Sequence, residues 1–250
     1  MPYLSRVWIN PLRPKGREYL RNPQATHAAI LSGFVSQPVG ERVLWRLTVD
    51  TRMVQGALRP VELLVLSASP PSLEHIVEGA GYPGSPDGPA VTRDYRPLLD
   101  RVVDGAEFAF RVRVNPVVAT VHPVAPSPAQ QRRLEEPGRR RGVRLPHRTL
   151  GHQLDWFASR AERWGFAIPR LDDTGALDLV TVEREQVSFP KGPVGDRRLV
   201  RLSTVTLEGR LRVVDRDAMI RSLLDGIGPA KAYGCGLLTL APLAHRVDPG

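Results

Sequence analysis

The chain repeats one order of predicted elements, and this repeat constrains its fold more than any other feature. The order is strand, helix, strand, strand, helix, strand, as hydrophobic periodicity and turn residues indicate. In the first pass the strands are 3–9, 43–50, 61–67 and a weak 94–99, and the helices are 22–32 and 72–78. In the second pass the strands are 107–114, 177–187, 199–214 and 236–240, and the helices are 149–164 and 216–224.

Two such units in tandem predict an α+β protein with two ferredoxin-like domains, each of βαββαβ order and similar to RRM-type RNA binders. We expect the domains to span 1–102 and 103–250. Helix signals agree with this order. Asn22 is a capping residue, Pro23 suits the first helical position, and Gly33 is a stop signal.

Composition narrows the class of protein. With 250 residues and 42% hydrophobic content, the chain can bury a substantial core. Its single cysteine, Cys235, excludes an internal disulfide and a multi-cysteine metal site. The N-terminus has no apolar signal segment, and no apolar run reaches the ~18 residues of a membrane span. We expect a cytoplasmic protein with no membrane partner.

The charge balance indicates a polyanionic partner. The formal net charge is +9, and only three of the 35 basic residues are lysine. The planar guanidinium of arginine pairs with phosphate through two hydrogen bonds, which suits nucleic-acid binding. Genome composition can also enrich arginine, but it does not explain the net excess of positive charge.

Residues 226–236 form a glycine-rich stretch, Gly-Ile-Gly-Pro-Ala-Lys-Ala-Tyr-Gly-Cys-Gly. Glycine accepts positive φ and leaves its N–H uncovered, and successive N–H groups beside Lys231 predict a phosphate-binding loop. The spacing fits neither a Walker A loop nor a dinucleotide fingerprint. A simpler interpretation is that Gly226 only ends the preceding helix. The predicted RNA contacts in this stretch are Gly226, Gly228, Lys231, Gly234 and Gly236.

Four segments, in this order along the chain, resemble those of one family. They are Tyr-Leu-Ser-Arg-Val at 3–7, Phe-Arg-Val-Arg-Val-Asn-Pro at 110–116, Thr-Val-Thr-Leu-Glu-Gly-Arg at 204–210, and the glycine-rich stretch with Leu-Leu and Leu-Ala-Pro-Leu after it. The chain resembles the CasE-type endoribonucleases, which process precursor CRISPR RNA in the type I-E Cascade complex. The resemblance spans nearly the whole chain, and its C-terminal loop is the specific part.

The resemblance implies a catalytic role for His27. Taken alone, this histidine falls in the apolar stripe of Ile30, Leu31 and Phe34 and reads as a core residue. Family members, however, carry their catalytic histidine on the first helix of the first domain. Imidazole can donate or accept a proton near neutral pH. The implied reaction is metal-independent attack of a ribose 2′-hydroxyl, which gives a 2′,3′-cyclic phosphate and a 5′-hydroxyl.

The sequence departs from the family one helical turn before His27. Some relatives have tyrosine there, whereas this chain has Gln24. Glutamine can hydrogen-bond a phosphate or orient His27, but it does not serve as a proton donor. The sequence therefore does not decide which residue assists His27 in catalysis, and Gln24 and Lys231 are the candidates.

Two basic segments are candidate RNA contacts. Residues 115–146 are proline-rich and predict a segment without fixed structure, serving either as an electrostatic arm for RNA or as a solvated linker. A predicted hairpin follows, which the resemblance assigns to the RNA stem and which also fits a charged edge. The residues proposed to bind RNA in the two segments are Arg139, Arg140, Arg141, Arg144, Arg184, Lys191, Arg197 and Arg198.

We therefore predict an endoribonuclease that cuts CRISPR repeat RNA at the base of its hairpin, stays bound to the product, and assembles with other Cascade subunits. The six histidines show no metal-ligand spacing, so we expect no metal and no cofactor. The alternative is a non-catalytic RNA-hairpin-binding subunit of the same complex. An RRM-like chaperone is disfavoured, because no strand carries the aromatic RNP signature.

Overall fold

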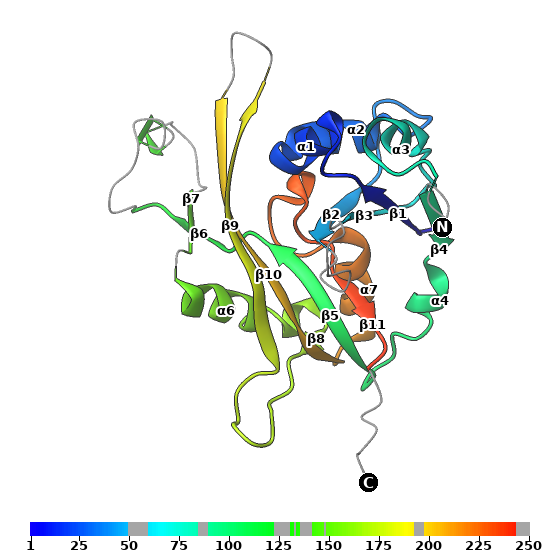
Figure 1. Ribbon diagram of the computed structural model, residues 1–250. Helices are drawn as coiled ribbons and strands as arrows, with labels where there is room; N and C mark the ends of the chain where they lie inside the picture. The colour runs from blue at the N-terminus through cyan, green and yellow to red at the C-terminus, as the bar shows by residue number, and fades with distance from the viewer. Residues whose placement is uncertain are drawn as a thin grey trace.

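The computed structural model contains two main antiparallel sheets that face each other across one interface (Figure 1). Each sheet comes from one half of the chain, so the predicted tandem arrangement of two ferredoxin-like domains is confirmed. A boundary at residue 102 stays a prediction. The structure describes residues 1–49, 60–84, 90–122, 131–132, 134–135, 142–147, 149–192 and 198–243.

Four strands form the N-terminal sheet: β1 (Tyr3–Ile9), β2 (Leu44–Val49), β3 (Val61–Ser67) and β4 (Ala90–Asp94). They lie in the order β2-β3-β1-β4, and every neighbouring pair is antiparallel. This order is what a βαββαβ unit produces, because each crossover helix skips over one strand. Three helices pack on the sheet: α1 (Pro14–Arg21), α2 (Pro23–Leu31) and α3 (Glu74–Ala80).

Two local predictions in this half are wrong. The last strand ends at Asp94, and residues Arg96–Leu99 form the short helix α4 instead of the predicted strand. Pro97 fits one of the first positions of a helix and lacks the N–H that a strand would use. Helix α1 was not anticipated, so α2 with His27 is the second helix of the domain, not the first.

The C-terminal sheet repeats the topology with longer strands. It consists of β5 (Glu107–Val114), β8 (Phe166–Ala167), β9 (Leu179–Lys191), β10 (Arg198–Val213) and β11 (Thr239–Ala241). The path β11-β5-β10-β8 matches the N-terminal order, and β9 pairs with β10 along its whole length. The predicted basic hairpin is therefore confirmed, and it extends well beyond the sheet (Figure 1).

Two further predictions in this half need correction. The helix expected at 149–164 ends earlier: α6 covers Leu150–Ala158, and a 3-10 turn, η1, covers Glu162–Trp164. The segment 115–146, expected to lack fixed structure, contains a small antiparallel pair, β6 (Val117–Thr120) and β7 (Val143–Pro146). The β-branched residues of both strands favour this pairing despite the prolines nearby.

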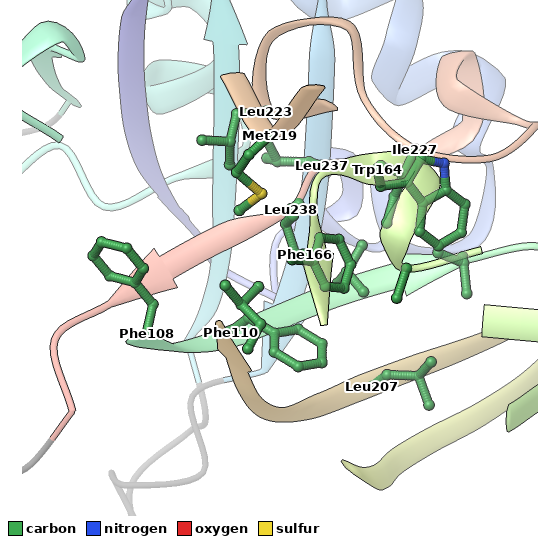
Figure 2. Packing of buried hydrophobic residues seen from close by; sticks show 14 of the residues in the cluster. Phe108, Phe110, Trp164, Phe166, Leu207, Met219, Leu223, Ile227, Leu237 and Leu238 are labelled. Carbon is green, nitrogen blue, oxygen red and sulfur yellow. The ribbon is translucent and has the colours of Figure 1, made fainter. Parts of the chain in front are cut away.

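The two hydrophobic clusters show how the sheets meet. Because side chains alternate along a strand, Leu63 and Val65 of β3 face α1–α3, whereas Leu64 and Leu66 face the C-terminal half. There they join the aromatic cluster shown in Figure 2, to which β5, α6, β10 and α7 (Arg216–Asp225) contribute. The core is therefore continuous across the interface between the two halves.

Arg46 of β2 ties the two sheets together. It is only 3% exposed. Its Nη1 donates to the carbonyls of Arg111 and Leu237 at 2.9 and 3.1 Å, and its Nη2 donates to Thr239 Oγ1 at 3.0 Å. Burial lowers the pKa of Arg46 to about 10, so it remains charged at neutral pH. These bonds fix β2 against β5 and β11 and hence set how the halves are oriented.

Candidate active site

Helix α2 places His27 at the junction of the two halves. Asn22 caps the helix, since its side chain accepts from the backbone N–H groups of Gln24 and Ala25 at 3.1 and 3.4 Å. His27 follows in the second turn and is half-buried. Ile30, on the same helix, is fully buried in the core, so His27 lies at the edge of the apolar face rather than in its centre.

The environment of His27 favours the neutral imidazole. Burial is the main cause that lowers its pKa below the ordinary value of 6.5, and the positive charge of Lys191 lowers it further. The ring nitrogen Nδ1 is enclosed and has no hydrogen-bond partner among the described residues. A core histidine is normally fixed by such a bond, so this geometry leaves the imidazole available for another partner.

Lys191 and Tyr233 approach His27 from the C-terminal half. Lys191 ends strand β9, and Tyr233 belongs to the 3-10 turn η2 (Lys231–Tyr233) in the glycine-rich stretch. The Lys191 ammonium lies 5.6 Å from the centre of the Tyr233 ring, a cation–π contact. That ring also packs on Phe189 with centroids 4.9 Å apart. Helix α2 contacts both β9 and η2, so three segments distant in sequence meet at one place.

The glycine-rich stretch follows α7, and its glycines allow close packing. Gly226, Gly228, Gly234 and Gly236 all have positive φ. A Cβ at Gly226 would meet Leu44 at 2.6 Å, and one at Gly234 would meet Trp45 at 2.8 Å, both on β2 of the other half. Gly226 also caps α7, as the simpler interpretation supposed. Their direct contact with RNA stays a prediction.

The charges described as acting on His27 do not include Lys231. It lies beside Arg42 and Asp225, and it lines a cleft with Arg160 and Arg163. Burial and the charge of Arg42 lower its pKa. Of the two lysines predicted to contact RNA, Lys191 therefore lies within electrostatic range of His27, whereas Lys231, the lysine expected to support His27, lines the cleft.

The remaining predicted residues are distributed along the hairpin and the inserted segment. Arg184 donates from Nε to Gln153 Oε1 at 3.0 Å, which fixes it against α6. Arg198 is exposed and stands opposite Lys191 in the β9–β10 register. Arg144 lies in strand β7. Four predicted contacts lie outside the described residues: Arg139, Arg140, Arg141 and Arg197.

Sequence reasoning missed Tyr233, Arg46 and Arg42. Tyr233 stands inside the glycine-rich stretch, where an aromatic residue among glycines was a usable signal. Arg46 interrupts an otherwise apolar strand, and a charge at a core position needs partners. Nothing in the local sequence distinguishes Arg42 from other surface arginines, because its importance arises from its position beside Lys231.

The described residues contain neither a cluster of metal ligands nor a membrane-spanning helix. No three His, Cys, Asp or Glu side chains gather there in an arrangement that could hold a metal ion. In the same residues, none of the helices combines the length and the apolar character that crossing a bilayer requires.

Comparisons with known proteins agree with the resemblance. The family model for CRISPR associated protein matches residues 2–242. The CRISPR-associated endoribonuclease Cse3 of Thermus thermophilus is 29% identical over 245 residues, which cover 96% of this chain and 100% of the relative. The CRISPR system Cascade subunit CasE of Escherichia coli is 32% identical over 139 residues, 56% of this chain and 60% of the relative.

A solved structure also resembles the chain over almost its full length. Thermus thermophilus Cse3 bound to an RNA representing a pre-cleavage complex superimposes with a TM-score of 0.70 at 26% identity. The match covers 96% of this chain and 99% of that one. The arrangement of the two halves is therefore shared with a protein that was seen holding RNA.

Proposed function

Because the chain belongs to the family of CRISPR-associated proteins, we propose that it is an endoribonuclease that cuts precursor CRISPR RNA at the base of the repeat hairpin. It remains bound to the mature guide and works with other Cascade subunits in the cytoplasm. The printed names of the relatives, an endoribonuclease and a Cascade subunit, support this assignment. The solved complex of a relative with an RNA representing a pre-cleavage complex supports RNA as the substrate class.

One observation carries the catalytic part of the proposal: a half-buried histidine with a lowered pKa faces a lysine from the other half. A general base has to be unprotonated at the working pH, and both burial and Lys191 keep His27 in that state. The enclosed Nδ1 leaves Nε2 as the ring nitrogen for substrate. Perturbed pKa values of ionisable groups cluster at functional sites, which supports a catalytic role for His27.

The reaction that suits this pair is internal transesterification. Nε2 of His27 takes the proton of the ribose 2′-hydroxyl, and the 2′ oxygen forms a bond to the adjacent phosphorus. The bond from phosphorus to the 5′ oxygen breaks, and that oxygen accepts a proton from the Lys191 ammonium or from water. The products are a 2′,3′-cyclic phosphate and a 5′-hydroxyl, as the sequence predicts.

Lys191 also stabilises the negative charge that accumulates on the phosphoryl oxygens in the transition state. Tyr233 holds this ammonium in place through its ring. Gln24, one helical turn before His27, is a candidate to orient a phosphate. The side chains themselves supply proton transfer and charge stabilisation, so the proposed reaction needs no metal ion.

Cleavage of a repeat RNA in the presence of EDTA tests the proposal. We expect cutting at a single position, with product ends that acid converts from cyclic phosphate to a mixture of 2′- and 3′-phosphates. Activity that requires added Mg²⁺, or that leaves a 5′-phosphate, would contradict this mechanism. Tight binding without cutting would favour the alternative, a non-catalytic subunit that holds the RNA hairpin.

A further inference from the structure

A second candidate RNA site, whose lining does not include His27, lies beside the glycine-rich stretch. The cleft there has a volume of about 910 Å³ and is walled by α6, η1, β6 and residues 226–232. Four cations line it: Arg42, Arg160, Arg163 and Lys231. No carboxylate is found among its described lining residues. Asp225 acts on Lys231 from outside this lining, and one carboxylate leaves three of the four positive charges uncompensated, so the arrangement favours an anionic ligand.

The cations are arranged for contact with a ligand. Arg160 donates from Nη1 to the Trp156 carbonyl at 2.9 Å, and its guanidinium lies 4.8 Å from the centre of the Trp156 ring. Among the described residues, Nε and Nη2 of Arg160 have no acceptor and remain for a phosphate. Arg42 and Arg163 are exposed and can move toward a bound strand. The positive charge of Arg42 already acts on Lys231.

The cleft also offers an apolar wall. Val117 and Val118 of β6 line it, and Val118 is 43% exposed. A free phosphate would use only the cations, whereas a nucleotide also presents a sugar and a base to such a wall. The volume is that of a small-ligand pocket. It accommodates a few nucleotides of single strand, not a double helix.

We propose that this cleft binds the single-stranded RNA that leaves the base of the hairpin. The proposal rests on the proposed function, which places the hairpin base at His27. Turn η2 connects the two places: Tyr233 lies at the His27 junction, and Lys231, two residues earlier, lies in the cleft. A strand that continues from the cut phosphate across this turn enters the cleft directly.

The test compares repeat hairpins with and without single-stranded flanks, on the 5′ or the 3′ side. The variant is Arg42→Gln with Arg163→Gln, since both side chains are exposed and the fold should tolerate the change. The matched control is Arg93→Gln with Arg101→Gln, two exposed arginines beside β4 and α4 on the far side of the molecule (Figure 1). A 2′-deoxy sugar at the cleaved nucleotide prevents turnover during the binding measurement.

For one of the flanked hairpins, we expect the cleft variant to reduce the slope of log affinity against log salt by about 1.4, or 0.7 for each lost phosphate contact. The trimmed hairpin should keep its slope, and the control variant should affect both RNAs equally. An equal loss on trimmed and flanked hairpins would overturn the proposal in favour of stem binding. No loss beyond the control would also overturn it and leave the cleft to an acidic protein partner.

Failure of the cleft assignment can be distinguished from failure of the proposed function. If the protein binds the flank through the cleft but cuts no unmodified RNA, only the catalytic assignment fails. If it cuts the trimmed and flanked hairpins and the cleft variant binds both normally, only the cleft assignment fails.

Discussion

The two sides of the glycine-rich stretch differ in how their positively charged side chains are arranged. On the junction side, one lysine lies near a half-buried histidine and lowers its pKa. On the cleft side, Lys231 and three arginines surround an open space, and two of the arginines are exposed. The first arrangement tunes one ionisable group, which is what catalysis requires. The second distributes charge over a surface, which is what backbone binding requires.

This difference shows why one short turn can serve two purposes. Residues 231 and 233 belong to the same 3-10 turn, yet their side chains take part in the two different sites. Glycines of the stretch pack closely against β2 and fix the turn. The side chains of residues 231 and 233 therefore each stay at their own site. We therefore expect substitutions on the junction side to change rates, and substitutions on the cleft side to change affinities.

The largest effect should come from His27→Ala. Loss of a general base typically slows a reaction by about 10²–10⁴-fold. RNA affinity should persist, because the charge of the protein at neutral pH is unchanged when a neutral histidine is removed. Single-turnover cleavage and RNA titration measure the two quantities separately.

His75→Ala is the matched control for His27→Ala. His75 is exposed, and its Nε2 lies 2.8 Å from the Ala29 carbonyl of the same helix α2. This variant should cut at the normal rate. If His27→Ala instead lowers the melting temperature strongly and cuts normally per folded molecule, His27 is a structural residue and the junction is not the catalytic side.

The next effect concerns the turn itself. Gly234→Ala combines a positive φ of 77° with a ring carbon of Trp45 only 2.8 Å from the added methyl. The backbone conformation costs on the order of 1–3 kcal/mol, and overpacking adds about 1–3 kcal/mol. Gly105 also has a positive φ, 84°, but a methyl added there meets nothing within 4 Å. Gly105→Ala should therefore lose only the stability that the backbone conformation costs.

Chemical unfolding of both glycine variants measures this difference. Equal free energies of unfolding would mean that Trp45 does not constrain Gly234. The turn could then change its conformation, and the argument that it keeps the junction side and the cleft side apart would lose support.

The smallest effect should come from Lys231→Ala. One lost phosphate contact on a single strand reduces the salt slope by about 0.7. The cleavage rate at saturating RNA should be unchanged, because Lys231 does not face His27. Arg93→Ala, at an exposed position on β4, provides the control for general loss of charge. A rate defect at saturation would move Lys231 to the junction side.

The sequence predicted the repeated topology because each element has a local signal. A nearly continuous run of apolar residues marks β3, and the Asn22-Pro23 pair marks the start of α2. Strand β4 and helix α4 were misassigned because a short segment around a proline fits either state until tertiary contacts decide. Helix α1 lacks a capping side chain, since Arg13 occupies that position, so its start was marked by Pro14 without a cap.

The site was only partly predictable for a related reason. A resemblance can assign His27 to a helix, but it cannot show that Lys191 reaches it from a strand 164 positions later in the chain. That approach depends on the orientation of the two halves, which Arg46 fixes through acceptors in β5 and near β11. Likewise, the glycines were read as openings for RNA, whereas the structure fills their Cβ positions with Leu44, Trp45 and Trp156.

The pH dependence of kcat/KM tests the central claim most directly, because it reports the pKa of the catalytic group in the free enzyme. His27 acts when neutral, so kcat/KM should rise with pH through a pKa below 6.5 and then level off. Lys191→Ala removes a charge that lowers this pKa, so the rising limb should move to higher pH. Lys191→Arg keeps the charge and should leave the limb in place. A limb that does not move in Lys191→Ala would contradict a catalytic centre shared between the two halves.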